Sequence, residues 1–213
     1  MEKLTEDKAL ELIRSTKALH EGHFVLTSGL HSGHFVSKDD VSTEPHVLEQ
    51  LAHDIAEHFW ESYPEVIAAP AVGAIALGNR VAENRGIKSI FAEQKDNRFV
   101  FGRGYSRFIK ASTKVLIVED IVTTGKTTRA MVEAINDLGG EVVGIGLLWN
   151  RGQEDLGAPV FACVNKAFPN FDPESCPLCR EGVSIDTQVN KHGQEFLDEY
   201  GEDPAGWPTN RKK

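Results

Sequence analysis

The segment from Val115 to Thr128, VLIVEDIVTTGKTT, contains residue types suited to binding a phosphorylated ligand. Its first four residues are apolar and mostly β-branched, which is typical of a buried strand in a parallel sheet. Glu119 and Asp120 follow at once, where we expect that strand to end. Because ligands of open α/β sheets bind at the carboxyl ends of the strands, these two acids are candidate ligand contacts.

The residues after the acids offer hydroxyl groups, a flexible backbone and one cation, and they are Thr123, Thr124, Gly125, Lys126 and Thr127. A helical pattern follows directly, with apolar residues at Met131, Ile135 and Leu138, and it is closed by two glycines. A helix start can hold a phosphate, because its free amide groups and positive dipole end point at the ligand. This part of the segment therefore predicts a phosphate site.

Two other interpretations fit parts of the same segment. Thr123 to Thr127 could simply cap a helix, but a buried strand, paired acids, Thr-Thr-Gly and a helix in succession are unusual for a plain turn. Gly125-Lys126-Thr127 also resembles the end of a nucleotide-binding P-loop. That motif needs a glycine five positions before Gly125, and Asp120 stands there, which excludes a P-loop.

The surrounding chain alternates between strand and helix patterns, which must position the central segment. Expected strands cover 66–69, 89–92, 115–118, 142–149 and 160–164, and an expected helix covers 75–84. This alternation predicts an α/β fold with a mostly parallel twisted sheet flanked by helices. Earlier in the chain, Thr5 caps one expected helix and Thr43-Glu44-Pro45 opens another.

Two further regions complete the predicted organisation. Residues 20–41 indicate a small hairpin-like hood with turns at Ser28-Gly29 and Ser32-Gly33. The composition changes near Phe168, so we expect a domain over 1–167, including the hood, and a C-terminal extension over 168–213 packed on it.

The overall composition limits the function classes. The chain has 213 residues, 40% hydrophobic and 26% charged, which suits one globular domain with a modest extension. A net charge of -9 argues against a nucleic-acid or membrane surface, although a local basic pocket for a phosphorylated small molecule remains compatible. No apolar run approaches the roughly 20 residues of a membrane span, and no signal peptide is evident. We therefore expect a cytoplasmic protein, and three cysteines agree with a reducing compartment.

A charged segment from Gln94 to Lys110 precedes the central motif. We expect it to be a mobile cationic loop around a short ribbon at Phe99 to Phe101, because it combines two glycines with Lys95, Arg98, Arg103, Arg107 and Lys110.

The residues from Val115 to Thr127 resemble the phosphoribosyl pyrophosphate (PRPP) signature of the type I phosphoribosyltransferases: a hydrophobic strand, two acids, two aliphatic residues, Thr-Thr-Gly and a final Thr. Within that superfamily, the chain from Ala18 to about Gly182 is similar to the orotate phosphoribosyltransferases. This similarity is carried by GHFVLTSG at 22–29, APAVGA at 69–74, WNRG at 149–152 and CPLC at 176–179.

The resemblance implies a role for each part of the motif. Glu119 and Asp120 would bind the ribose 2- and 3-hydroxyls of PRPP, and the residues from Thr123 to Thr127 would hold its 5-phosphate. The pyrophosphate loop would be Ala71, Val72, Gly73 and Ala74. Mg²⁺ is the implied cofactor, and it would bridge the diphosphate and the ribose hydroxyls without a direct side-chain ligand.

The implied reaction is displacement of pyrophosphate from C1 of the ribose by orotate, giving orotidine 5-monophosphate. Thr123 and Arg151 would contact orotate. Lys95, Arg98 and Arg103 are the expected catalytic cations, which would close over the diphosphate. In the family this loop reaches the partner subunit's site, so a homodimer is implied, with small-molecule substrates and neither nucleic acid nor membrane as partner.

The chain departs from the enterobacterial branch, which has a lysine where this chain places Gly73, and arginines here replace most lysines of the loop. Two alternatives stay open: a phosphoribosyltransferase for another base, and a PRPP-responsive regulator without catalysis. A regulator would need no closing cationic loop and would carry a basic DNA-binding segment, which this acidic chain lacks.

Histidines and cysteines offer separate metal hypotheses. His20 with His23 and His31 with His34 have a metal-like spacing, but neither pair falls on a clear helix, so hydrogen bonding is the simpler interpretation. The Cys176-x-x-Cys179 pair supplies two of the four ligands that zinc needs. Cys163 or His192 would have to complete the set; otherwise the pair is two reduced thiols in a turn.

Overall fold

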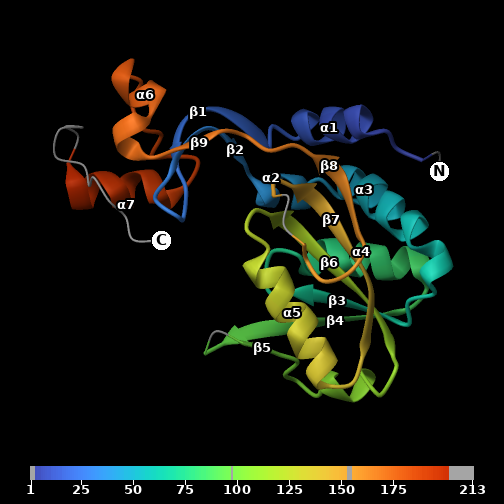
Figure 1. The fold of residues 1–213 in the computed structure, drawn as a ribbon. Coiled ribbons are helices and arrows are strands. Elements are labelled where there is room, and N and C mark those ends of the chain that lie inside the picture. The colour runs from blue at the N-terminus through green and yellow to red at the C-terminus, as the bar shows by residue number, and fades with distance from the viewer. Residues whose placement is uncertain (1–2, 97, 153–154, 202–213) are drawn as a thin grey trace. The chain divides into compact units, whose positions relative to one another are not determined.

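The computed structural model describes residues 3–96, 98–152 and 155–201 and divides them into two compact units (Figure 1). The first unit contains the described residues up to Thr16 together with Lys38–Ala167. The second contains Lys17–Ser37 and the described residues from Phe168 onward. Residues 20–37 of the predicted hood are therefore grouped with the C-terminal segment, whereas residues 38–41 belong to the first unit. Positions 202–213 of the predicted extension lie outside the described residues.

A six-stranded sheet, in the order β5-β4-β3-β6-β7-β8, forms the centre of the described part of the first unit. Its strands are β3 (Val66–Pro70), β4 (Lys88–Lys95), β5 (Arg98–Val100), β6 (Lys114–Val122), β7 (Glu141–Asn150) and β8 (Val160–Asn165). All neighbouring strands pair in parallel except β5, which is antiparallel to β4. The mostly parallel α/β sheet expected from the alternating pattern is confirmed.

Helices cover both faces of this sheet, with α3 and α4 on one side and α5 on the other (Figure 1). The helices of the first unit are α1 (Glu6–Ser15), α2 (Lys38–Ser42), α3 (Pro45–His58), α4 (Ile75–Arg85) and α5 (Lys126–Asp137), and short 3-10 turns cover Trp60–Ser62 and Tyr105–Phe108. None of the helices in the described ranges is long and apolar enough to cross a membrane.

Tight packing explains the composition of the central strands. Val115 and the three residues after it are fully buried, as expected for a strand covered on both faces. A Cβ atom at Gly144 or Gly146 of β7 would overlap the side chains of Phe59 and Ile55, respectively, at the end of α3. Small residues on β7 therefore let α3 lie close to the sheet.

Local signals at the helix ends are mostly confirmed. Thr5 caps α1, because its Oγ1 accepts a hydrogen bond from the Lys8 amide at 3.3 Å. Gly86 ends α4 in the left-handed conformation. The short helix α2 was not predicted, since five residues are too few to show a helical period.

The second unit has a small sheet in the order β1-β2-β9 among its described residues. Its elements are β1 (Leu19–Val25), β2 (His31–Val36), β9 (Asn170–Phe171), a 3-10 turn (Pro173–Ser175), α6 (Pro177–Arg180) and α7 (Lys191–Tyr200). The hairpin turn predicted at Ser28-Gly29 is confirmed. The turn predicted at Ser32-Gly33 is wrong, because Ser32 pairs with Phe24 on one side and Asn170 on the other, and these pairings extend the strand.

Candidate active site

The acid pair lies inside β6, whereas the sequence placed it after the strand. β6 continues to Val122 and remains paired with β7 as far as Asn150. Successive side chains of a strand point to opposite faces of a sheet. Glu119 accordingly reaches Thr128 of α5, and Asp120 reaches Lys38 of α2. The two carboxylates are thus tied to different neighbouring elements.

Glu119 is a buried carboxyl group, only 6% exposed, that accepts a hydrogen bond from the Thr128 hydroxyl. Burial raises the pKa of Glu119 to about 7, and the neighbouring Asp120 charge adds to this rise. The Thr128 hydrogen bond and the Lys38 charge act in the opposite direction and favour the carboxylate. Glu119 therefore changes charge in the neutral pH range.

Asp120 is held by two contacts. Its Oδ2 lies 3.0 Å from Lys38 Nζ, and its Oδ1 accepts a hydrogen bond from the Ile121 amide at 2.6 Å. Sequence reasoning missed Lys38, because nothing in the local pattern connects the start of a short helix with an acid on a distant strand. The ion pair fixes the direction of the Asp120 carboxylate.

The predicted pyrophosphate loop, Ala71 to Ala74, follows β3 and lies against the same ion pair. The Ala71 amide donates to the Ala92 carbonyl at 2.8 Å, the peptide bond between Ala71 and Val72 is cis, and the Val72 side chain is 81% exposed. A Cβ atom at Gly73 would overlap both Lys38 Nζ and Asp120 Oδ2. Glycine is therefore required if the loop is to approach the acids this closely.

The predicted phosphate site lies at the start of α5. Gly125 precedes the helix in the left-handed conformation, with φ 68° and ψ 8°, and no side chain caps the first turn. The side chains of Thr123, Thr124, Lys126 and Thr127 are exposed around this start. Arg129 stabilises the loop, because its Nη2 donates a hydrogen bond to the Thr124 carbonyl at 2.8 Å. The first-turn amides are thus available to an anion.

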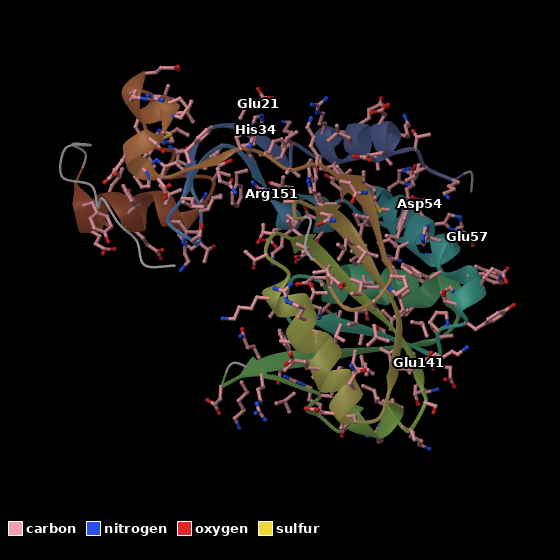
Figure 2. The ribbon with its side chains drawn as sticks, viewed as in Figure 1. Glu21, His34, Asp54, Glu57, Glu141 and Arg151 are labelled. Atoms are coloured by element: carbon pink, nitrogen blue, oxygen red, sulfur yellow. The ribbon has the colours of Figure 1, made fainter. Side chains whose placement is uncertain are left out.

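Arg151, labelled in Figure 2, follows β7 directly. Its amide donates to the Val122 carbonyl at 2.8 Å, and a Cβ atom at Gly152 would overlap the Thr123 carbonyl oxygen. The Arg151 side chain is half-buried, and burial lowers the pKa of its guanidinium. The structure therefore brings the predicted orotate contacts Thr123 and Arg151 onto neighbouring loops.

Within the expected cationic loop, residues 94–95 and 98–100 belong to the β4–β5 hairpin, and Tyr105–Phe108 form a 3-10 turn. Lys95 and Arg98 are paired across the tip of the hairpin, and both are exposed. Phe99 and the nearby Phe101 are buried in the core that α5 covers, so the expected ribbon is anchored by its aromatic residues. Arg103 lies at the base of the hairpin, where its Nη2 pairs with Glu93 Oε1 at 3.0 Å. The three predicted catalytic cations are spread along the hairpin.

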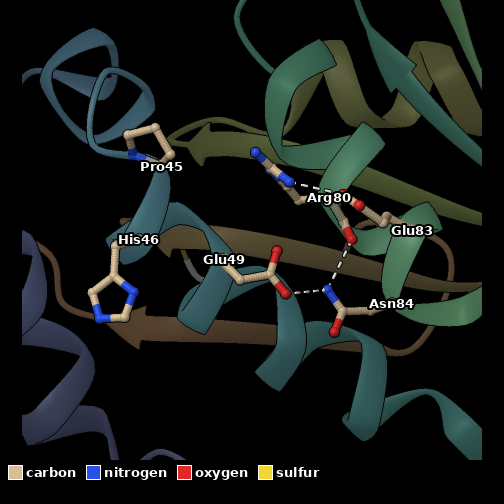
Figure 3. A pocket seen from close by; sticks show the side chains of 6 residues that line it. All are labelled: Pro45, His46, Glu49, Arg80, Glu83 and Asn84. Carbon is tan, nitrogen blue, oxygen red and sulfur yellow. Dashed lines mark hydrogen bonds and ion pairs between the residues drawn. The ribbon is translucent and has the colours of Figure 1, made fainter.

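A separate hollow of about 450 Å³ lies between α3 and α4 (Figure 3). Its polar groups are engaged with each other: Asn84 Nδ2 donates to Glu49 Oε1 at 2.9 Å, and Arg80 pairs with Glu83 at 2.8 Å. This hollow belongs to the helix layer, away from the carboxyl ends of the strands where α/β sheets bind ligands. The loops after β3, β6 and β7 are the better candidate site.

Comparison with known proteins agrees with this choice. Residues 39–163, which include the acid pair and both loops, match the family model described as "Phosphoribosyl transferase domain". The chain belongs to this family. Among similar phosphoribosyltransferases, the orotate phosphoribosyltransferase of Caldicellulosiruptor bescii is 37% identical over 184 residues, which cover 85% of this chain and 96% of that protein.

Solved structures show the same phosphoribosyltransferase fold. UMP synthase of Leishmania donovani has a TM-score of 0.62 at 20% identity, and the match covers 92% of this chain but 43% of that longer chain. The orotate phosphoribosyltransferase of Mycobacterium tuberculosis has a TM-score of 0.60 at 22% identity, covering 75% of this chain and 95% of that one. The predicted type I fold is thereby confirmed.

Proposed function

We propose that this phosphoribosyltransferase uses orotate, transferring the phosphoribosyl group of PRPP to it and releasing pyrophosphate, as in de novo UMP synthesis. One observation carries the PRPP site: Glu119 is bonded to the helix start at Thr128, and its neighbour Asp120 is bonded to Lys38 beside Gly73. A single stretch of β6 thus joins two anion-binding turns. Orotate as the base is supported by the curated relatives, which cover most of the chain.

In this proposal each part of PRPP meets one part of the site. The ribose 2- and 3-hydroxyls donate to Glu119 and Asp120, which are held at the carboxyl end of β6. The 5-phosphate accepts hydrogen bonds from the exposed amides and hydroxyls between Thr123 and Thr127, where the helix dipole favours negative charge. The backbone of the Ala71 to Ala74 loop faces the diphosphate, whose approach is helped by small side chains.

The chemical step breaks the bond between C1 and the diphosphate oxygen and forms a bond from C1 to a ring nitrogen of orotate, whose N–H proton passes to solvent or to the released pyrophosphate. Positive charge grows on the sugar and negative charge on the leaving group. Lys95, Arg98 and Arg103 would stabilise that leaving group once the hairpin closes over a site, in this chain or in the second copy of a homodimer. Arg151 and Thr123 would orient orotate, because a guanidinium pairs well with a carboxylate.

The donor set of the site suits Mg²⁺ that arrives with the substrate. Both carboxylates are already engaged, Glu119 by Thr128 and Asp120 by Lys38, which leaves few protein oxygens for a complete cage. Mg²⁺ commonly keeps several waters and binds through substrate phosphates. When bound, the ion would neutralise diphosphate charge, while Glu119 and Asp120 would orient the ribose hydroxyls. We also propose a cytoplasmic location with small-molecule substrates only.

The test is turnover of the purified full-length chain with PRPP, Mg²⁺ and, separately, orotate, uracil, adenine and hypoxanthine, followed by pyrophosphate release. Of these four bases, we expect only orotate to give pyrophosphate release. Turnover with another base but not orotate would overturn the substrate assignment while keeping the enzyme class. PRPP binding without turnover on any base would favour the regulator instead.

A further inference from the structure

A second chemical cluster lies in the compact unit formed by Lys17–Ser37 and the segment from Phe168. It contains His23, His31, Cys176 and Cys179, whose nearest nitrogen and sulfur atoms all lie within 4.8 Å of one another. His31 and Cys176 are fully buried, His23 is almost fully buried and Cys179 is half-buried. His23 and His31 lie on β1 and β2, Cys176 is the N-cap of α6 and Cys179 lies within α6, so the fold has brought together groups that the sequence keeps far apart.

The distances in this cluster suit one tetrahedral ion. His23 Nε2 lies 3.7 Å from Cys176 Sγ and 3.6 Å from Cys179 Sγ, and His31 Nδ1 lies 3.3 Å from Cys179 Sγ and 2.8 Å from His23 Nε2. Tetrahedral zinc with usual bond lengths separates its nitrogen and sulfur ligands by about 3.3 to 3.8 Å. To admit the ion, the two ring nitrogens would move apart, and ligand atoms separated by up to 4.8 Å would move closer together.

The environment orients the ligands as a metal site requires. His23 Nδ1 donates to the Val183 carbonyl at 2.7 Å, which directs the Nε2 lone pair of the neutral ring toward the two thiols. Val25 pairs with His31, and His23 lies two residues before Val25, so the alternation of β1 places the His23 ring on the same side as His31. Phe196 packs edge-on against His31 at 5.1 Å and shields the cluster.

We propose that His23, His31, Cys176 and Cys179 bind one structural zinc ion. Two nitrogens and two thiolates in a tetrahedron form a typical closed zinc site, which leaves no position for substrate. A two-iron cluster is disfavoured, because it would place the histidines on one iron and the cysteines on the other. Here each histidine nitrogen lies close to a sulfur.

The proposed ion also has a physical role. Val25 and Phe196 form a small buried apolar cluster in this unit, against which Cys179, Ile185, Leu197 and Tyr200 pack. Small units with little apolar core commonly depend on a metal or disulfides. The zinc would fasten the β1–β2 hairpin to the N-terminal end of α6. This role does not depend on the proposed reaction.

The site differs from both metal hypotheses of the sequence. Neither histidine pair acts as a unit: His34 stacks on Phe168 at 4.2 Å, while its partner His31 joins the cysteines. The CxxC pair is completed neither by His192, whose Nε2 bonds Thr27 Oγ1 at 3.1 Å, nor by Cys163, whose sulfur contacts the Leu51 carbonyl. Because the histidines and the cysteines are so distant in the chain, no local sequence spacing could predict this ligand set.

Metal content of the full-length protein, measured by mass spectrometry after purification without added metal, tests this proposal. We expect one zinc per chain in the natural protein, and at least tenfold less in Cys176→Ser and Cys179→Ser. Cys163→Ser is the matched cysteine control and His34→Asn the matched histidine control, and both should keep their zinc. Zinc that is absent from the natural protein, replaced by iron, or retained in both cysteine variants would overturn the proposal.

Because a cysteine variant could lose zinc by failing to fold, cobalt replacement in the natural protein gives an independent readout. Cobalt bound here should show the intense visible bands of a tetrahedral ion and a thiolate charge-transfer band. An octahedral spectrum without that band would contradict the ligand set. Neither measurement uses turnover, so failure here is distinct from failure of the proposed function.

Discussion

In the proposed PRPP site, one proton on Glu119 would couple stability to ligand binding. Burial raises the pKa of Glu119 from 4.5 to about 7, so the folded protein holds this proton where the unfolded chain releases it. The resulting stabilisation is fully present below about pH 4.5 and is lost as the pH rises through about 7. Ribose hydroxyls prefer the ionised carboxylate as acceptor, so binding should improve over the range in which this stabilisation disappears.

Thr128→Val tests that coupling at the level of one hydroxyl group. The Thr128 hydrogen bond lowers the Glu119 pKa, so its loss should move the acidic limb of the kcat/KM profile upward by about one pH unit. Activity should fall at neutral pH and recover at higher pH. Thr43→Val, which removes an exposed hydroxyl bonded to the Asp40 carbonyl, should leave the profile unchanged. An unshifted profile in Thr128→Val would show that Glu119 does not set the limb.

At the scale of elements, the start of α5 depends on a glycine that serves two purposes. Gly125 has φ 68°, which other residues adopt with strain, and its missing side chain leaves room for Leu156. Gly86 at the end of α4 has a similar φ of 65°, but no atom lies within 4 Å of a Cβ built there. An alanine at Gly86 would therefore introduce backbone strain alone. An alanine at Gly125 would introduce the same strain and also displace the loop before α5.

We expect Gly86→Ala to cost about 1 kcal/mol of stability without changing kinetics. Gly125→Ala should lose at least as much stability and, in addition, raise KM for PRPP about tenfold or more, since the loop must move to clear Leu156. Thermal unfolding and steady-state kinetics of both variants measure this difference. Equal KM values in the two variants would argue against a phosphate site at this helix start.

The sequence predicted those elements whose signal is local. The apolar run at Val115 and the glycine at Gly86 marked a strand and a helix end, because burial and backbone conformation select residue types directly. The ribbon after β4 was also visible from its aromatic residues. The sequence did not show that β6 continues beyond the acids, since pairing with β7 rather than residue preference extends it.

At the scale of the whole molecule, the two compact units are discontinuous in sequence. The candidate PRPP site lies within the first unit, and motif spacing was sufficient to find its loops. The role of Lys38 could not be predicted from the sequence, because its partner Asp120 lies on another element. The proposed zinc ligand set could not be predicted for the same reason, since its histidines and cysteines come from the two separate segments of the second unit. Contacts between distant segments thus account for both omissions.

The central claim is that the β6 acids hold the ribose of PRPP, and Asp120→Asn tests it most directly. The variant keeps the shape of the side chain but removes the negative charge that pairs with Lys38 and that, in the proposal, accepts hydrogen bonds from the ribose hydroxyls. We expect kcat/KM for PRPP to fall about 100-fold, or about 2.7 kcal/mol, with weaker PRPP binding measured by calorimetry without orotate. Asp137→Asn, at the exposed far end of α5, is the control and should match the natural protein. Unchanged PRPP affinity and kinetics in Asp120→Asn would contradict the account.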